Sequence, residues 1–338
     1  MVGQETEETD LKEASFDKLK SNVSFDYHSS RFFSLVFLAI YIVAITVFCL
    51  EYKIIPGPEF LVLGILFIAA YNKQTYRALK DWLPFITVFL SYEVMYSFVG
   101  TVSSSNLHSG PEIIDTRLFG QVPSLILQQY FRFPVLDYMG AFFYSIYFFV
   151  PTIFAFVVWK KSPKNYWKYT VAFGVLTYSA LITFLFYPVA PPWIQFSSFL
   201  NHAYSGPQVV RVLTGSVDPS LGFPVYKTLF DFLSPNNYAA FPSMHSAIPW
   251  LVFLFAFKIW KWKALPVLSI PVGTWFSAIY LGEHYFTDVV GGIVYATVAY
   301  LAVVKLLPYL STKVSFLQNH VPTEKSQTTQ PKKTELRK

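Results

Sequence analysis

The sequence has few charged residues and a single cysteine. Of its 338 residues, 14% are charged, against about 25% in soluble proteins, whereas 54% are hydrophobic. Cys49 stands alone, which excludes an intramolecular disulfide and a thiolate metal cluster, and we expect it to be a small buried hydrophobe. This shortage of charge excludes an ordinary soluble domain and indicates a polytopic membrane protein.

The two ends of the sequence lack long apolar runs. Residues 1–30 carry seven acids against three lysines and have no basic region before an apolar segment, so they do not resemble a cleaved signal peptide. Residues 311–338 carry six basic residues against two acids. Neither end can bury enough apolar surface to fold alone, so we predict two disordered cytoplasmic tails around one membrane-embedded domain, 31–310.

The apolar stretches of this domain are long enough to cross a bilayer, whose core of about 30 Å needs roughly 20 helical residues. We predict an all-α fold, a polytopic transmembrane helical bundle of about eight spans with a six-helix catalytic core. The stretch at 60–72 is the shortest and is either a tilted span or a helix buried among the others. The predicted spans are 32–50, 60–72, 82–99, 138–159, 169–188, 244–257, 264–281 and 289–304.

Basic residues set the predicted orientation. They cluster in the short loops 73–80, 160–168 and 258–263, which are cytoplasmic by the positive-inside rule. Eight spans then place both termini in the cytoplasm and the segment 189–243, a long ordered or re-entrant loop, at the extracytoplasmic face. The net charge of +6 lies in tails and loops beside spans, so it indicates contact with anionic membrane lipids and not with nucleic acid.

Two histidines and an aspartate lie at that same face, where apolar runs begin. If the last span starts just before His284, Asp288 follows one turn later, and its carboxylate accepts a hydrogen bond from one imidazole nitrogen and raises the basicity of the other. The hairpin of two spans that precedes it returns His245 to the same surface. Gly291 and Gly292 would let another helix pack closely beneath the site. A lone histidine is usually a membrane-interface anchor, but three ionisable residues gathered at one face indicate a functional site.

These residues resemble the motifs of the type 2 phosphatidic acid phosphatase superfamily of lipid phosphatases and phosphotransferases. Residues 242–245, Pro-Ser-Met-His, match its Pro-Ser-Gly-His motif. Ser277, His284 and Asp288 match its third motif, with Ala278 in place of the usual arginine. The resemblance covers about residues 185–300 and points to the branch that contains inositol phosphorylceramide synthase, on the segments 190–193, 239–245 and 280–288.

The resemblance implies a lipid phosphotransferase that uses no metal or other cofactor. His284 would attack the phosphorus to form a phosphohistidine, Asp288 would orient and charge-stabilise it, and His245 would protonate the departing alkoxide. The donor would be a phospholipid with a phosphoinositol-like headgroup, and the acceptor a lipid alcohol. Two alternatives remain open: a phosphatase for phosphatidic acid or a related lipid, which passes the same intermediate to water, and a non-enzymatic lipid transporter or scaffold.

The superfamily's first motif, a lysine followed seven residues later by Arg-Pro, is absent, so the phosphate needs other partners. Arg211 is the best candidate, because it ends a 42-residue charge-free stretch on the predicted outer side and its guanidinium can contact phosphate bidentately. Ser243 is expected to add a hydroxyl or a backbone donor, to cap a helix, or both. Glu93, an acid within an apolar span, is expected to help bind the acceptor. Weaker phosphate-binding candidates are Arg117, Arg132 and Lys227.

Overall fold

A computed structural model describes most of the chain between residues 81 and 308. The described residues are 81–89, 107–197, 205–233 and 236–308, with Val43, Val47, Ser91, Tyr92 and Tyr96. Several predictions fall outside them, namely those for the tails 1–30 and 311–338, for nearly all of the spans 32–50 and 60–72, and for Cys49 and Glu93.

The described residues are helical, as predicted, with one isolated parallel bridge between Val189 and Ala239. After the helical residues 81–89, the elements are α5 (Gly110–Phe119), α6 (Pro123–Tyr130), α7 (Pro134–Ile146), α8 (Val150–Lys161), α9 (Pro163–Phe186), α10 (Pro192–Gln195), the π-helix η2 (Leu213–Val217), α11 (Asp218–Leu221), α12 (Val225–Leu233), α13 (Met244–Trp260), the 3₁₀-helix η3 (Lys261–Leu268), α14 (Ser269–Tyr280), α15 (Phe286–Leu301) and the π-helix η4 (Ala302–Leu306).

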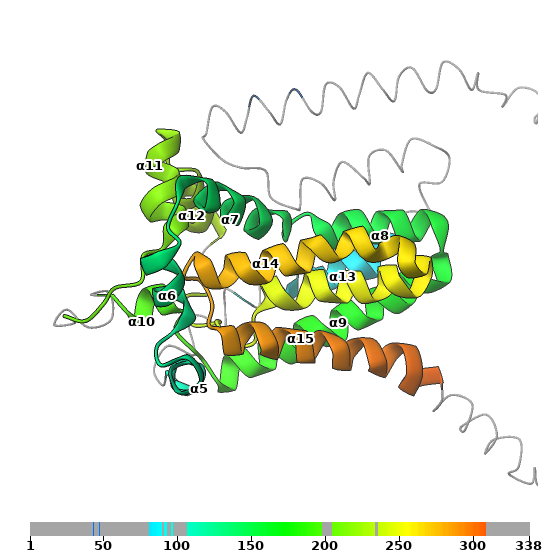
Figure 1. Cartoon of the computed structure of the whole chain (residues 1–338). Coiled ribbons are helices and arrows are strands. Elements are labelled where there is room, and N and C mark those ends of the chain that lie inside the picture. Colours follow the sequence, from blue (N-terminus) through cyan, green and yellow to red (C-terminus); the bar gives the residue numbers. More distant parts are fainter. Residues whose placement is uncertain are drawn as a thin grey trace, which may run out of the picture.

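The long helices form a bundle, and the short ones gather at one end of it. Helices α8, α9, α13, α14 and α15 run side by side, whereas α5, α6, α10, α11 and α12 lie together at the end where α13 and α15 begin (Figure 1). Helix α13 is central, because it packs against α8, α9, α14 and α15. In its described parts, the segment predicted as a long ordered or re-entrant loop, 189–243, contains the short helices α10, η2, α11 and α12 at one end of the bundle.

Helices of the bundle coincide with the predicted spans. Two of them, α9 and the continuous helix Phe286–Leu306, are long and apolar enough to cross a membrane. Helices α7 and α8 make a third if they count as one span across their 47° bend. Helices α13 and η3–α14 occupy the predicted spans 244–257 and 264–281, but they are not among the candidate spans found in the described residues. The predicted total of eight spans and the six-helix core are not tested by these residues.

The outer face of α15 carries exposed apolar side chains at helical spacing. Val290, Val294, Val298 and Leu301 recur every three or four residues and leave 41%, 52%, 60% and 39% of their surface uncovered. A continuous apolar stripe of this kind is unfavourable in water and suits contact with lipid chains. The face of α15 that lacks this stripe packs against α13 and α9.

An aromatic cluster joins the helical residues 81–89 to α8 and α9. Trp82 is fully buried and its ring contacts those of Phe85, Trp159 and Tyr166 at centroid distances of 5.7, 6.0 and 5.8 Å. The indole of Trp159 donates to the Asp81 carboxylate at 2.9 Å, and the Tyr166 hydroxyl donates to the Asp81 carbonyl at 2.9 Å. The ring N–H of Trp159 and the hydroxyl of Tyr166 are both hydrogen-bonded. The cluster therefore combines burial of apolar surface with a defined orientation of these two rings.

Two glycines let the start of α15 approach the start of α13, as predicted. A Cβ atom on Gly292 would collide with the backbone carbonyl oxygen of Ser243 and lie 3.0 Å from Cβ of Ser246. On Gly291 it would lie 2.5 Å from the Phe241 ring. The contact at Gly292 is with backbone, which cannot move aside as a flexible side chain would.

We therefore predict that Gly292→Ala destabilises the protein and lowers its activity. The added methyl group pushes α15 away from α13, at a cost of about 1–3 kcal/mol. Thermal unfolding in detergent measures this as a lower melting temperature. Gly174→Ala in α9 is the control, since its Cβ would meet Val88 at an ordinary 3.6 Å. Equal melting temperatures for the two variants would contradict the argument.

Candidate active site

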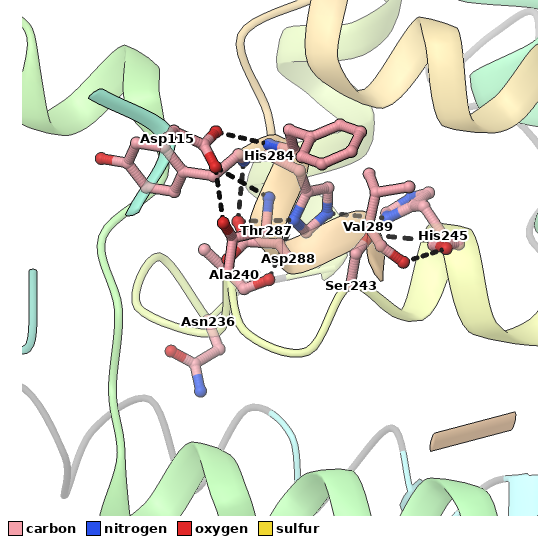
Figure 2. Close-up of polar contacts among 12 residues, drawn as sticks. Asp115, Asn236, Ala240, Ser243, His245, His284, Thr287, Asp288 and Val289 are labelled. Atoms are coloured by element: carbon pink, nitrogen blue, oxygen red, sulfur yellow. Dashed lines mark hydrogen bonds and ion pairs between the residues drawn. The ribbon is translucent and has the colours of Figure 1, made fainter. Parts of the chain in front are cut away.

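The two motif histidines meet at the end of the bundle covered by the short helices. His245 lies in the first turn of α13 and His284 just before α15. Nε2 of His284 lies 3.4 Å from Nδ1 of His245, and the two rings face each other (Figure 2). The predicted closure of the 39-residue hairpin is confirmed.

A backbone carbonyl sets the tautomer of His284. Nδ1 of His284 lies 3.0 Å from the carbonyl oxygen of Ala240. A carbonyl only accepts, so Nδ1 carries the proton and Nε2 of the neutral ring carries the lone pair that faces His245. Ala240 is held in turn by Val189, because the Ala240 amide donates to the Val189 carbonyl at 3.1 Å. The bridge that follows α9 thus orients the imidazole.

Asp288 contacts His284 in a way that the sequence did not predict. The prediction that the last helix begins before His284 is wrong, because α15 begins at Phe286 with Tyr285 as its N-cap. Asp288 is the third residue of this helix, and its Oδ2 accepts from the Tyr285 amide at 2.8 Å. The same oxygen lies 3.6 Å from Nδ1 of His284, too far for a hydrogen bond but close enough for an ion pair when the ring is protonated. Asp288 caps the helix in preference to a hydrogen bond with His284, because the first amides of a helix have no hydrogen-bond partner within it.

Tyr144 of α7 and Tyr147, the residue that follows this helix, both contact the His245 ring. The Tyr144 ring stacks on it at 3.9 Å and the Tyr147 ring lies at 4.1 Å. These ring contacts fix the plane of the imidazole whose Nδ1 lies next to His284. Nε2 of His245 is buried and has no hydrogen-bond partner among the described residues.

Arg211 lies beside the histidines and is paired with Glu283. Its Nε donates to Glu283 Oε1 at 2.7 Å and its Nη2 to Oε2 at 3.2 Å, which leaves Nη1 outside the pair. The guanidinium carbon lies 4.3 Å from the centroid of the Trp193 ring and 3.8 Å from that of the Phe230 ring, so both rings contact it. The predicted phosphate ligand is therefore rigidly held, and its charge is balanced by a carboxylate that adjoins His284 in the chain.

These residues surround one cavity with a largely aromatic wall. His245, His284, Arg211 and Glu283 all line it. Trp193, Arg211 and Phe230 also line a second, outer pocket, so these three residues form the wall between the cavity and that pocket. Among the described residues, no group of three His, Cys, Asp or Glu side chains is placed to hold a metal ion. The aromatic residues of the inner cavity include Tyr92, Tyr96, Tyr144, Tyr147, Phe148 and Phe184.

The other predicted phosphate ligands lie elsewhere. Ser243 is fully buried and caps α13, accepting from the Ser246 amide at 3.3 Å, while its own amide donates to the Asp288 carbonyl at 3.0 Å. It is not among the described residues that line the cavity. Arg132 donates to Ser216 at 2.5 Å, and Lys227 pairs with Asp231 at 2.7 Å in exposed positions. Arg117 lies in the last turn of α5 and is likewise not among the described residues that line the cavity.

Sequence reasoning missed Asp115, which caps α15 from outside that helix. Its carboxylate accepts from the Phe286 amide at 2.7 Å and from the Thr287 amide and hydroxyl at 3.0 and 2.6 Å (Figure 2). Burial raises the pKa of Asp115 above its usual value, and the bonds from Thr287 and Phe286 act in the opposite direction. No motif or spacing marks this residue, because its partners are 171 and 172 positions away.

Gln128 of α6 was also missed, and it positions the segment that carries Arg211. Its amide nitrogen donates to the carbonyls of Val210 and Tyr280, each at 2.9 Å. Its amide oxygen accepts from the Val210 amide at 2.9 Å. One side chain thus joins the segment before Arg211 to the end of α14. Unlike Asp115 and Gln128, Glu283 could have been identified from the sequence, because it directly precedes His284.

We predict that Asp115→Ala lowers both stability and turnover. Without the carboxylate, the first amides of α15 lose their acceptor, which costs about 1–2 kcal/mol for a helix cap, and the loop with His284 loses its support. Thermal unfolding and turnover are measured together. Asp231→Ala is the control, since its exposed pair with Lys227 contributes at most about 1 kcal/mol. An Asp115→Ala protein that matched this control would contradict the assignment.

The sequence profile of the PAP2 superfamily matches residues 113–302, more than half of the chain and all three of His245, His284 and Asp288. No solved structure matches the chain.

Curated relatives are similar over different lengths. A phosphoinositol dihydroceramide synthase of Bacteroides thetaiotaomicron is 26% identical over 260 residues, which cover 72% of this chain and 83% of that protein. An inositol phosphorylceramide synthase of Candida albicans is 28% identical over 160 residues, 47% of this chain and 34% of that protein. The catalytic subunit of the Schizosaccharomyces pombe inositol phosphorylceramide synthase is 27% identical over 186 residues, which cover 53% of this chain and 43% of that protein. The chain thus spans less than half of the two fungal proteins.

Proposed function

The chain belongs to the PAP2 superfamily of lipid phosphatases and phosphotransferases, and we propose that it transfers a phospho-headgroup from a phospholipid to a lipid alcohol. The observation that carries the proposal is the contact between Nε2 of His284 and Nδ1 of His245 in an aromatic cavity. A lone pair on one ring and a proton on the other are what a nucleophile and a general acid require.

The first half of the reaction follows from this arrangement. Nε2 of His284 attacks the phosphorus of the donor, an N–P bond forms, and the P–O bond to the diacylglycerol oxygen breaks. His245 enters this step as the imidazolium, gives one of its two ring protons to the departing alkoxide and is left neutral. Nδ1 of His284 carries a positive charge after the attack, and Asp288 at 3.6 Å stabilises that charge.

The second half reverses these roles. His245, now a neutral imidazole, takes the proton of the acceptor hydroxyl on its free nitrogen, and the acceptor oxygen attacks the phosphorus. The N–P bond breaks and His284 returns to its starting state. Nη1 of Arg211, which the pair with Glu283 does not use, is available to a phosphate oxygen in both steps.

The names of the relatives favour a phosphoinositol-like headgroup and a ceramide-like acceptor. All three proteins are named for synthesis of an inositol phosphorylceramide or phosphoinositol dihydroceramide. An aromatic wall with hydroxyl and amide groups suits a polyol headgroup, whose C–H faces pack on rings. A phosphatase for phosphatidic acid that uses the same residues is the second candidate, since water can replace the alcohol at the same intermediate.

We further propose that residues 31–310 form one multi-pass membrane domain with both termini in the cytoplasm. The site then opens at the lumenal or external face, because the lysine-rich connection after α8 lies opposite the end where α13 and α15 begin. The apolar stripe of α15 and the apolar length of α9 support contact with membrane lipids.

We predict that His284→Ala loses headgroup transfer by about a thousandfold or more, as expected for a covalent nucleophile. Detergent-purified protein receives labelled phosphatidylinositol or phosphatidic acid, with and without ceramide or diacylglycerol. New phospholipid and free phosphate are both measured. His108→Ala is the matched control, because His108 is exposed and is not among the described residues that line the cavity. Phosphate release without any new lipid would favour the phosphatase, and activity in His284→Ala would contradict the proposal.

We also predict a covalent intermediate when the acceptor is left out. Label from a headgroup-labelled donor remains on the wild-type chain after denaturation, stable in base and lost in acid, as a histidine N–P bond requires. The His284→Ala chain carries no label. Base-labile label, or label on both chains, would show that another residue is modified.

A further inference from the structure

The charges on the wall of the cavity cancel. Arg211 is the single lysine or arginine among the described residues that line it, and Glu283 lines it as well. Their two contacts of 2.7 and 3.2 Å join the groups, and only 17% and 6% of the side chains are exposed. A phosphate that reaches His284 therefore meets a cation that a carboxylate already neutralises.

Phosphate esters differ in the charge that they bring to such a site. A monoester carries between about −1.5 and −2 at pH 7, because its second pKa is about 6, whereas a diester carries a single charge. A phosphate oxygen bound to Nη1 of Arg211 contacts the same guanidinium as the Glu283 carboxylate. The two negative groups are then separated by no more than the width of that guanidinium. Poor solvation strengthens the repulsion between the carboxylate and a second negative charge on the phosphate.

We infer that Glu283 is a specificity-determining residue that admits singly charged phosphodiesters and disfavours doubly charged phosphomonoesters. The inference rests on the proposed function, since the phosphate has to reach His284. The two residues share one loop, and the amides of Glu283 and His284 both donate to the Ala278 carbonyl, at 3.1 and 3.0 Å. The repelling charge is thus carried beside the nucleophile, and it favours headgroup transfer over hydrolysis of phosphatidic acid.

The negative charge of Glu283 is not needed to keep Arg211 in place. Trp193 and Phe230 both pack against the guanidinium, and Arg211 is further held by the segment that Gln128 secures. A neutral glutamine can still accept one hydrogen bond from the arginine. Glu283→Gln therefore removes the charge while it keeps the shape of the wall.

The test compares two lipids that release the same product. Phosphatidic acid is the monoester and phosphatidylmethanol the diester, and in both the attack of His284 breaks the P–O bond to diacylglycerol, which takes its proton from His245. Diacylglycerol release is measured about two pH units above the second pKa of the monoester, with phosphatidylinositol as reference donor. The proteins are the wild type, Glu283→Gln, Glu283→Asp and the control Asp231→Asn, which removes an exposed carboxylate next to the outer pocket.

We expect the wild type, Glu283→Asp and Asp231→Asn to prefer phosphatidylmethanol, and Glu283→Gln to shift the ratio toward phosphatidic acid by about tenfold or more. An unchanged ratio in folded Glu283→Gln, or a parallel loss of both activities, would overturn the inference. If Glu283→Gln does not fold, the wild type decides alone, since equal rates on the two lipids would overturn it. A wild type that releases no diacylglycerol even from phosphatidylinositol would instead refute the proposed function.

Discussion

The close approach of α13 and α15 at their starting ends is the contact on which the site depends. The Ser243 amide donates to the Asp288 carbonyl at 3.0 Å, and the Ser246 hydroxyl donates to the Val289 carbonyl at 2.7 Å. Gly292 leaves no side chain between the two backbones. Since His245 and His284 sit at these two ends, the backbone contact sets the distance between their rings. The relative position of these two candidate catalytic histidines is therefore a consequence of helix packing.

The carboxylates near this contact are each held by a neighbouring hydrogen-bond donor. Asp115 and Asp288 both accept from amides at the start of α15, where the helix dipole favours negative charge. The carboxylate of Asp288 therefore has a structural bond as well as a place near His284. Glu283 is occupied in the same way by Arg211. Each of these buried carboxylates accepts from a neighbouring N–H group, as burial of an ionised group demands, although Oδ1 of Asp288 is buried with no hydrogen-bond partner among the described residues.

The short helices at the end of the bundle explain how a membrane enzyme can keep a polar site. Helices α5 and α6 and the segment 205–233 supply Asp115, Gln128 and Arg211, which lie outside the long bundle helices. They cover the ends of α13 and α15 (Figure 1). Residues of the aromatic wall below them also belong to the apolar core of the bundle, so under the proposed function a lipid would present its headgroup to the histidines while its chains stay in an apolar environment.

The sequence alone determined the class of protein, the helical fold, the family and the meeting of His245 with His284, because composition, apolar run length and motif order are local or one-dimensional signals. Only the tertiary structure decided the partners. Long-range contacts made by Asp115 and Gln128 leave no trace in spacing, and the α15 cap drew Asp288 to the Tyr285 amide because unpaired helix amides bind the nearest carboxylate. The neutralisation of Arg211 by Glu283, 72 residues away, likewise depends on how the chain folds back and not on either residue's neighbours.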